Sequence, residues 1–130
     1  MLVIGGCELS HEKNPYSSIE AIKYDCDTKK LTISEFPNAC PIPVRSPMSY
    51  FDKAKRNLFI FGGCRGPKDH IEDIQVYDFT TSTWSLAPFK LYKGRSCFML
   101  STFGPHLYLL GGFDGYDCLR EVERVDLTTQ

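Results

Sequence analysis

The stretch Leu58-Phe59-Ile60-Phe61-Gly62-Gly63 decides the fold, because four apolar residues run directly into a pair of glycines. Four consecutive apolar side chains are typical of a short strand that is covered on both faces. The same pattern ends at Gly5-Gly6 and at Gly111-Gly112, 57 residues earlier and 49 residues later. A period of about 50 residues with several short strands per copy is typical of propeller blades. The sequence therefore predicts three copies of one β-sheet repeat.

A second feature recurs downstream of each glycine pair. After a loop of variable length, an aromatic or β-branched residue precedes an aspartate, at Tyr24-Asp25, Tyr77-Asp78 and Val125-Asp126. Trp84 stands seven residues after Tyr77, where a large ring fills the widening gap between neighbouring radial sheets. We assign structural roles to the residues of this pattern, namely Gly5, Gly6, Gly62, Gly63, Gly111, Gly112, Tyr24, Tyr77 and Trp84.

The middle copy is complete and predicts four antiparallel strands, expected near residues 46–51, 58–61, 74–77 and 84–86. The first copy begins in its second strand, and the third copy ends before its fourth. The predicted fold is all-β, a partial propeller of about two and a half four-stranded blades, and propellers close with about four to eight. We therefore expect a piece of a longer protein. The predicted repeats are 1–44 without a first strand, 45–94 complete, and 95–130 without a last strand.

Composition limits the class of protein. Of the 130 residues, 42% are hydrophobic and 13% aromatic, as in packed globular proteins. Fifteen basic and sixteen acidic residues leave a net charge of −1, which argues against nucleic acid or an anionic membrane as the main partner. Six cysteines occur without a recognisable signal peptide, so we expect reduced thiols in a cytoplasmic or nuclear protein.

The third copy carries the most specific motif. Leu109-Leu110-Gly111-Gly112-Phe113-Asp114-Gly115, followed by Leu119, Val122-Glu123-Arg124 and Asp126, closely resembles the kelch repeat. The resemblance extends over essentially the whole chain, and it is strongest to the kelch-like proteins that also carry BTB and BACK domains. Leu31 stands where the repeat has tryptophan, a departure that leaves the implied fold unchanged.

The resemblance implies a propeller that captures another protein. In BTB-BACK-kelch members the propeller recognises the substrate of a cullin-RING E3 ubiquitin ligase, which binds the BTB and BACK parts. Two alternatives stay open, an actin-binding or cytoskeletal scaffold and a fragment of a kelch-fold enzyme such as a sugar isomerase or copper oxidase. We expect a protein-binding module without enzymatic activity or cofactor, whose partners are proteins and neither nucleic acid nor membrane.

The strand order indicates where a partner would bind. In an antiparallel four-strand meander, the loops between second and third strands emerge on the same face as the connections between blades. That face gathers residues 7–18, 64–73 and 113–118. It also gathers Arg45-Ser46 and Arg95-Ser96, which lie 17 and 16 residues before a glycine pair. In the family that the chain resembles, such arginines line the mouth of the central channel.

Arginine forks and neighbouring hydroxyls suit carboxylates and phosphates, so an acidic or phosphorylated loop is the expected partner. The alternative is that each arginine satisfies local carbonyls or pairs with a neighbouring acid. The predicted partner-binding residues are Arg45, Ser46, Arg95, Ser96, Arg65, His70 and Tyr116.

Metal binding and catalysis receive weaker support. Cys7 with His11, and Cys64 with His70, recur in corresponding loops and supply the elements of a zinc site. The loops differ in length and contain no C-x-x-C, so we predict no metal site.

No G-x-S-x-G or phosphate loop accompanies His106 or Asp69-His70, and we predict no catalytic residues. Glu123-Arg124 is interpreted as a solvated charge pair on an outer strand.

Overall fold

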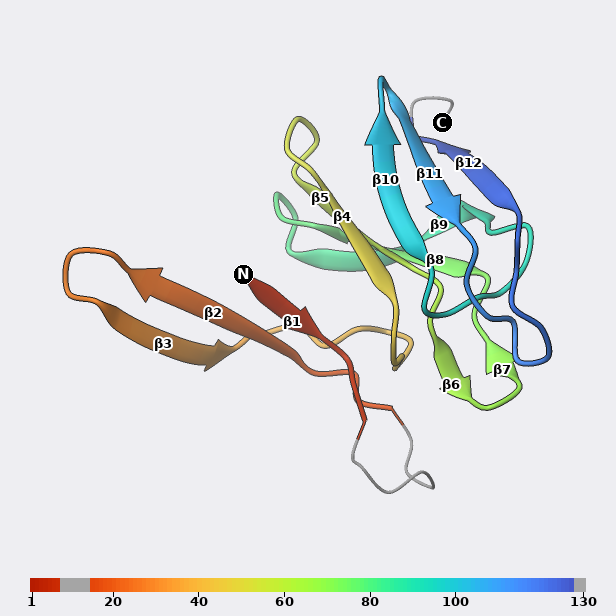
Figure 1. The fold of residues 1–130 in the computed structure, drawn as a ribbon. Coiled ribbons are helices and arrows are strands. Elements are labelled where there is room, and N and C mark those ends of the chain that lie inside the picture. Colours follow the sequence, from red (N-terminus) through yellow and green to blue (C-terminus); the bar gives the residue numbers. More distant parts are fainter. Residues whose placement is uncertain (8–14, 128–130) are drawn as a thin grey trace.

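The computed structural model describes residues 1–7 and 15–127 (Figure 1). Blade 1 has the strand order β1 (Leu2–Ile4), β2 (Ile19–Asp25), β3 (Lys30–Glu35). Blade 2 has the order β4 (Met48–Asp52), β5 (Asn57–Phe61), β8 (Asp73–Asp78), β9 (Thr83–Lys90). Blade 3 has the order β10 (Met99–Phe103), β11 (His106–Leu110), β12 (Val122–Asp126). These antiparallel sheets of three, four and three strands confirm the predicted all-β partial propeller.

The structure adds detail that the sequence did not predict. The expected loop after the second glycine pair contains a small hairpin, β6 (Cys64–Gly66) with β7 (Asp69–His70). Strand β9 is longer than the predicted 84–86, because a register shift beyond Gln75 lets it pair as far as Asp73 with Lys90. Within the described ranges, no helix of a length and hydrophobicity suited to crossing a membrane is found.

Side-chain alternation along β5 explains how three sheets share two cores. Successive residues of a strand point to opposite faces. Phe59 and Phe61 accordingly belong to the cluster shared with blade 3, whereas Leu58 and Ile60 belong to the cluster shared with blade 1. All four are buried. The uninterrupted apolar sequence of this strand is therefore required by its position between two neighbouring blades.

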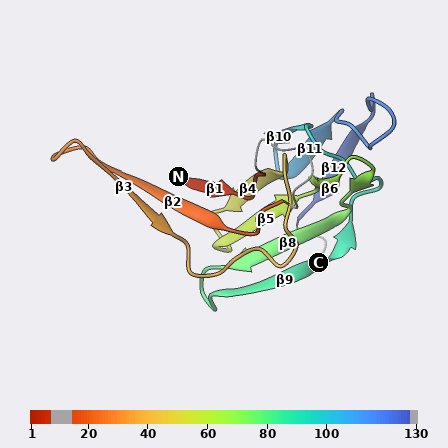
Figure 2. The ribbon, with the colours of Figure 1, turned by 90° about the horizontal axis from the view of Figure 1, so that it is seen from below.

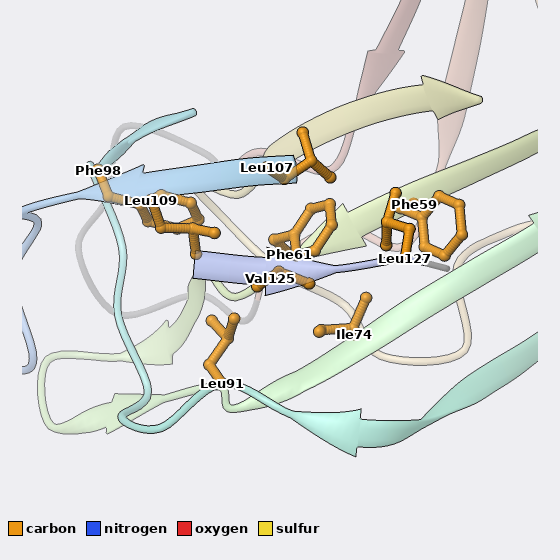
Figure 3. Close-up of a cluster of buried hydrophobic side chains, with 9 residues drawn as sticks. All are labelled: Phe59, Phe61, Ile74, Leu91, Phe98, Leu107, Leu109, Val125 and Leu127. Atoms are coloured by element: carbon orange, nitrogen blue, oxygen red, sulfur yellow. The ribbon is translucent and has the colours of Figure 1, made fainter. Parts of the chain in front are cut away.

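Figure 3 shows the core between blades 2 and 3. Phe61 and Ile74 from blade 2 meet Leu109 and Val125 from blade 3, with Leu91 of the connection between the blades beside them. Phe61, Ile74 and Leu109 have no exposed surface. The neighbouring sheets are held together by buried apolar area, which contributes roughly 25 cal/mol per Å².

The glycine pairs have the conformation that their position in the repeat requires. Gly62 and Gly63 have φ angles of 55° and 91°, a region in which side chains with a Cβ are strained. A Cβ on Gly62 would also lie 2.5 Å from the backbone oxygen of Arg95. The Gly63 amide donates to that same oxygen at 2.8 Å. The pair therefore ends β5 and fixes the chain to the start of the next blade.

The aromatic residues of the repeat differ in burial between blades. Tyr77 is 3% exposed, and its hydroxyl accepts a hydrogen bond from Asn38 Nδ2 at 3.0 Å. Trp84 Nε1 donates to the Asn38 carbonyl at 3.2 Å. Counted through the strand register from the glycine pairs, Ile22 of blade 1 corresponds to Tyr77. Tyr24 of the first Tyr-Asp motif lies two residues further along β2 and is 57% exposed. Figures 1 and 2 show the reason, since β2 and β3 extend as a hairpin away from blades 2 and 3.

Candidate functional site

The β6–β7 hairpin and the loop between β11 and β12 lie side by side at one end of the molecule (Figures 1 and 2). The His70 ring meets the Phe113 ring edge to face, with centroids 5.6 Å apart. Lys68 Nζ lies 5.2 Å from the centre of the Tyr116 ring, within the range of a cation–π contact. We call this surface the loop face, and it consists of residues 64–72 and 113–118 with Arg45.

Arg45 connects the loop face to blade 2. Its backbone pairs with Cys64 in both directions, with N–H to O distances of 3.0 Å. Its Nε donates to the Cys64 sulfur at 3.3 Å. The Cys64 and Cys7 thiols raise the pKa of the partly exposed guanidinium above its ordinary value. Among the residues that the structure describes, no carboxylate forms an ion pair with Arg45.

Arg95 has a different environment, because it is 1% exposed. Its Nη2 forms an ion pair with Glu123 Oε2 at 3.0 Å, outside the alignment of a hydrogen bond. Its Nη1 donates to the Gly111 carbonyl at 3.2 Å and its Nε to the Lys93 carbonyl at 3.3 Å. Arg95 therefore matches the alternative interpretation, in which the arginine binds local carbonyls and pairs with a neighbouring acid. Burial argues against direct contact of Arg95 with a partner.

Arg45 and Arg95 were predicted to share one repeat position, and the strand register shows that this alignment is wrong by one residue. Arg45 bridges Cys64, which follows the second glycine pair, whereas the corresponding bridge to Phe113 is made by Ser96. The turn between β4 and β5 has four residues, 53–56, and the turn between β10 and β11 has two, 104–105. Counting back from the glycines therefore shifts the register, and Arg95 corresponds to Val44.

The two serines that were predicted to bind a partner, Ser46 and Ser96, differ in exposure. Ser46 is exposed and has a φ of 52°, and its carbonyl accepts from the Cys97 amide at 3.3 Å. Ser96 is 3% exposed, and its hydroxyl is hydrogen-bonded to His70 Nε2 at 3.0 Å. Ser46 is thus placed where a partner can reach it, while Ser96 positions the β6–β7 hairpin against blade 3.

His70 is held within the loop face. Burial lowers the pKa of its imidazole, against the opposite effect of the nearby Asp114 and Asp69 carboxylates. Its Nδ1 is buried and has no hydrogen-bond partner in the described part of the chain. With Nε2 bonded to Ser96, the ring joins two loops. We therefore assign His70 a positioning role in the loop face.

Arg65 and Asp69 of the loop face form an ion pair. Arg65 binds Asp69 in a two-pronged arrangement, with Nε to Oδ2 at 2.9 Å and Nη2 to Oδ1 at 3.2 Å. Both partners are about half exposed, so the pair contributes little to stability. Tyr116 is 68% exposed. Arg65 and Tyr116 are therefore accessible, and Arg65 already has an acidic partner.

Asp114 organises the blade 3 loop. Its Oδ1 accepts from the amides of Tyr116 at 2.8 Å and Asp117 at 2.7 Å, and its other oxygen pairs with Lys93. The Asp117 amide, the Lys93 ammonium and the Tyr116 amide together hold the pKa of this carboxyl well below its usual range. Asp114 was not predicted from the sequence, although the preference of aspartate for such turns provides a signal.

Two alternatives considered at the sequence level can be compared with the structure. Cys64 faces His70 across the β6–β7 register, whereas His11 lies outside the described residues. Residues 1–7 and 15–127 contain no group of three or more His, Cys, Asp or Glu arranged to hold a metal ion. His106 begins β11, at the opposite end of blade 3 from the loop face (Figure 1). The structure therefore does not bring His106 together with Asp69 and His70.

Glu123 is a structural residue that the sequence analysis misjudged. It was interpreted as solvated, yet its Oε1 accepts from the Tyr92 amide at 2.8 Å while its Oε2 faces Arg95. Gln75 has a similar role in blade 2. Its amide oxygen accepts from the Ile42 N–H at 2.8 Å, and its amide nitrogen donates to the Ile42 carbonyl at 3.0 Å. Gln75 and Glu123 each precede the Tyr77 or Val125 position by two residues, a signal that could have identified both.

Three radial sheets joined through glycine pairs define a repeat of the propeller class. The Kelch motif model matches residues 55–88 and 94–130, and the chain belongs to the kelch-repeat family. It is 30% identical over 109 residues to the F-box/kelch-repeat protein SKIP4 of Arabidopsis thaliana, covering 84% of this chain and 27% of that protein. The chain thus spans about a quarter of that relative. Kelch repeats make it a protein–protein interaction module.

Proposed function

We propose that the loop face captures a partner protein and that Arg45 binds an acidic or phosphorylated group of that partner. The observation that carries this proposal is the guanidinium of Arg45, which is partly exposed and contacts thiols instead of a carboxylate among the described residues. Charge-assisted hydrogen bonds to carboxylate or phosphate are stronger than neutral ones. A planar fork recognises both groups through two parallel bonds.

The neighbouring residues supply the other parts of a binding surface. The exposed Tyr116 offers a large contact area and is supported from one side by Lys68; exposed aromatics often anchor interfaces. Ser46 adds an accessible hydroxyl next to Arg45. Arg95, Ser96 and His70 have a supporting role in this proposal, because their side chains hold the loops in place. The partner would thus contact a preorganised surface, which reduces the entropy lost on binding.

The cellular role that we propose is substrate recognition for an E3 ubiquitin ligase adaptor. The Arabidopsis relative combines kelch repeats with an F-box, and this combination supports a role in ubiquitin transfer. The resemblance to BTB-BACK-kelch proteins favours a cullin-RING ligase, joined through regions beyond this chain. Localisation in the cytoplasm or nucleus fits this role.

The experiment is quantitative capture of partners by the 130-residue chain, followed by mass spectrometry. Arg45→Met keeps the length of the side chain and removes its charge, and we expect capture to weaken about tenfold or more. Arg56→Met, in the exposed β4–β5 turn at the other end of blade 2, is the matched control. Equal capture by both variants would show that Arg45 is not the binding residue.

The same preparation separates the proposed cellular roles. Recovery of substrates whose ubiquitination in cells depends on the protein supports the adaptor role. Co-sedimentation with actin filaments would instead support the cytoskeletal alternative, and turnover of a small molecule would support a kelch-fold enzyme.

A further inference from the structure

Ser46 differs from the other serines and threonines of the chain because a proline follows it. The sequence contains eight prolines, and Pro47 is the one that stands directly after a serine or a threonine. Proline-directed protein kinases select this dipeptide and transfer the γ-phosphoryl group of ATP to the hydroxyl. Arg45 precedes the dipeptide, so the hydroxyl that such a kinase would modify belongs to the residue next to the cation of the loop face.

The side chain of Ser46 is accessible to an enzyme. The residue is exposed and lies at the entry to blade 2, which has a neighbouring blade on either side. Its backbone carbonyl accepts from the Cys97 amide at 3.3 Å. Among the described residues its hydroxyl forms no hydrogen bond. Modification of the hydroxyl therefore breaks no side-chain contact within residues 1–7 and 15–127.

The backbone at Ser46 also suits modification. Its φ of 52° lies in the left-handed region, which is uncommon for residues with a Cβ. A residue before proline prefers an extended conformation, the form in which kinases bind their substrates. Cys97 occupies the corresponding position of blade 3 with a φ of 53°. The repeat therefore requires this conformation but does not require a serine.

Arg45 can receive the phosphate of a modified Ser46. Its Nε donates to the Cys64 sulfur at 3.3 Å, and sulfur is a weak acceptor. A phosphoserine carries a charge of about −1.5 to −2 at pH 7 and three strong acceptor oxygens, so its bonds to a guanidinium are stronger. Neighbouring side chains point to opposite faces in extended backbone, and the left-handed conformation of Ser46 interrupts that alternation.

We propose that Ser46 is phosphorylated by a proline-directed kinase and that its phosphate pairs with Arg45, which prevents Arg45 from binding an anionic partner. In the modification, the Ser46 oxygen forms a bond to the γ-phosphorus of ATP while the bond from that phosphorus to the β–γ bridging oxygen breaks. ADP leaves, and the hydroxyl proton passes to the catalytic base of the kinase. This inference rests on the proposed function, because it describes how the same site is regulated.

Phosphoryl transfer to the 130-residue chain is the first test. The chain is incubated with ATP and either a mitogen-activated or a cyclin-dependent protein kinase, and peptide mass spectrometry locates the phosphate. We expect phosphate on Ser46 and none at this position in Ser46→Asn, a change that the positive φ tolerates. Ser82 is the internal control, because it is exposed and has a φ of 58° but precedes a threonine. An unmodified Ser46 with both kinases, or equal modification of Ser82, would overturn the proposal.

Phosphorus NMR of the modified chain tests the pairing with Arg45 without any partner protein. The chemical shift of phosphoserine follows its second ionisation, which has a pKa of about 6 in an isolated residue. A guanidinium stabilises the dianion, so we expect a lower pKa in the native chain and a higher one in Arg45→Met. Arg56→Met, in the β4–β5 turn, is expected to leave the pKa unchanged. Equal values in Arg45→Met and the native chain would overturn the pairing.

Partner capture tests the regulatory consequence. We expect phosphorylation of Ser46 to weaken capture about tenfold or more. Ser46→Asp supplies part of the charge and Ser46→Asn is its uncharged isostere, and the positive φ tolerates both. We expect Ser46→Asp to capture about threefold less than Ser46→Asn. The pair Ser82→Asp and Ser82→Asn, in the β8–β9 turn at the other end of blade 2, is the control and should show no difference.

The outcomes separate this inference from the proposed function. Equal capture by the modified and unmodified chains, or by Ser46→Asp and Ser46→Asn, would overturn the regulation while the proposed function stands. Absence of capture by the native chain would instead overturn the proposed function. The phosphoryl transfer and the NMR titration would then still decide whether Ser46 is modified and whether its phosphate pairs with Arg45. Circular dichroism verifies that each variant retains its strands.

Discussion

The buried ion pair between Arg95 and Glu123 can be tested against blade 2, which is built with uncharged residues at the corresponding positions. Val44 and Gln75 occupy the corresponding positions there, and both are buried. Arg95→Val leaves the Glu123 carboxylate without its cation. Removal of one partner of a buried pair costs about 3–5 kcal/mol. We expect about 3 kcal/mol, at the lower end, because the side chain of Glu123 is 15% exposed and keeps its bond from the Tyr92 amide.

The double variant Arg95→Val with Glu123→Gln recreates the arrangement of blade 2. The new amide oxygen can keep the bond from the Tyr92 N–H without a charge, as the Gln75 amide oxygen accepts from the Ile42 N–H. We expect the double variant to lie within about 2 kcal/mol of the native chain, because replacing a buried pair by neutral groups is often close to neutral. Glu123→Gln alone leaves Arg95 uncompensated and is expected to cost about 2–3 kcal/mol.

Urea unfolding at one fixed protein concentration measures these differences, with the fluorescence of the single tryptophan as the signal. With an m value of about 1.5 kcal/mol/M, a loss of about 3 kcal/mol lowers the midpoint by roughly 2 M. A fixed concentration is needed because association shifts apparent stability. A loss of less than about 1 kcal/mol for Arg95→Val, or a loss in the double variant equal to the sum of the two single losses, would show that the two side chains do not depend on each other.

Three further outcomes follow from individual contacts. Tyr77→Phe should lower the free energy of unfolding by about 1 kcal/mol through a lost hydrogen bond, whereas Tyr24→Phe should change it little; equal effects in urea titrations would contradict this. Gly62→Ala should cost more than Gly104→Ala, since both have positive φ but only Gly62 has a backbone oxygen in the way; thermal melts compare them. Asp114 has a lowered pKa in the folded chain, so it stabilises above its unfolded pKa of about 4 and loses this effect as pH falls. Asp114→Asn should therefore flatten the dependence of the melting temperature on pH below about 4.

The fold could be predicted because its signals are local. The positive φ of Gly62 and Gly63 requires glycine irrespective of the surroundings. The apolar sequence of β5 reflects two covered faces, which any blade between two others has. Tyr77 and Trp84 were likewise identified from their spacing, and both contact Asn38 in the connection from blade 1.

The site was predicted less well because it depends on register between strands. The β4–β5 turn is two residues longer than the β10–β11 turn, so the residue of blade 3 that corresponds to Arg45 is Ser96. Arg95 lies one position earlier, where its side chain is in the core and not on the loop face. Glu123 was misjudged for a related reason. Its neighbour in sequence is Arg124, but its ionic partner is Arg95, which lies at the start of the blade.

The corrected register strengthens the assignment of Arg45. At its backbone position blade 3 has Ser96, a small residue that bonds His70, so a long cation is not required to build this part of a blade. One position earlier, Val44 and Arg95 show that a blade can be built with or without charge. Arg95 has an acidic partner, whereas Arg45 has none among the described residues. A cation that neither the repeat nor an acid among the described residues requires supports the proposal that Arg45 binds an anionic group of a partner.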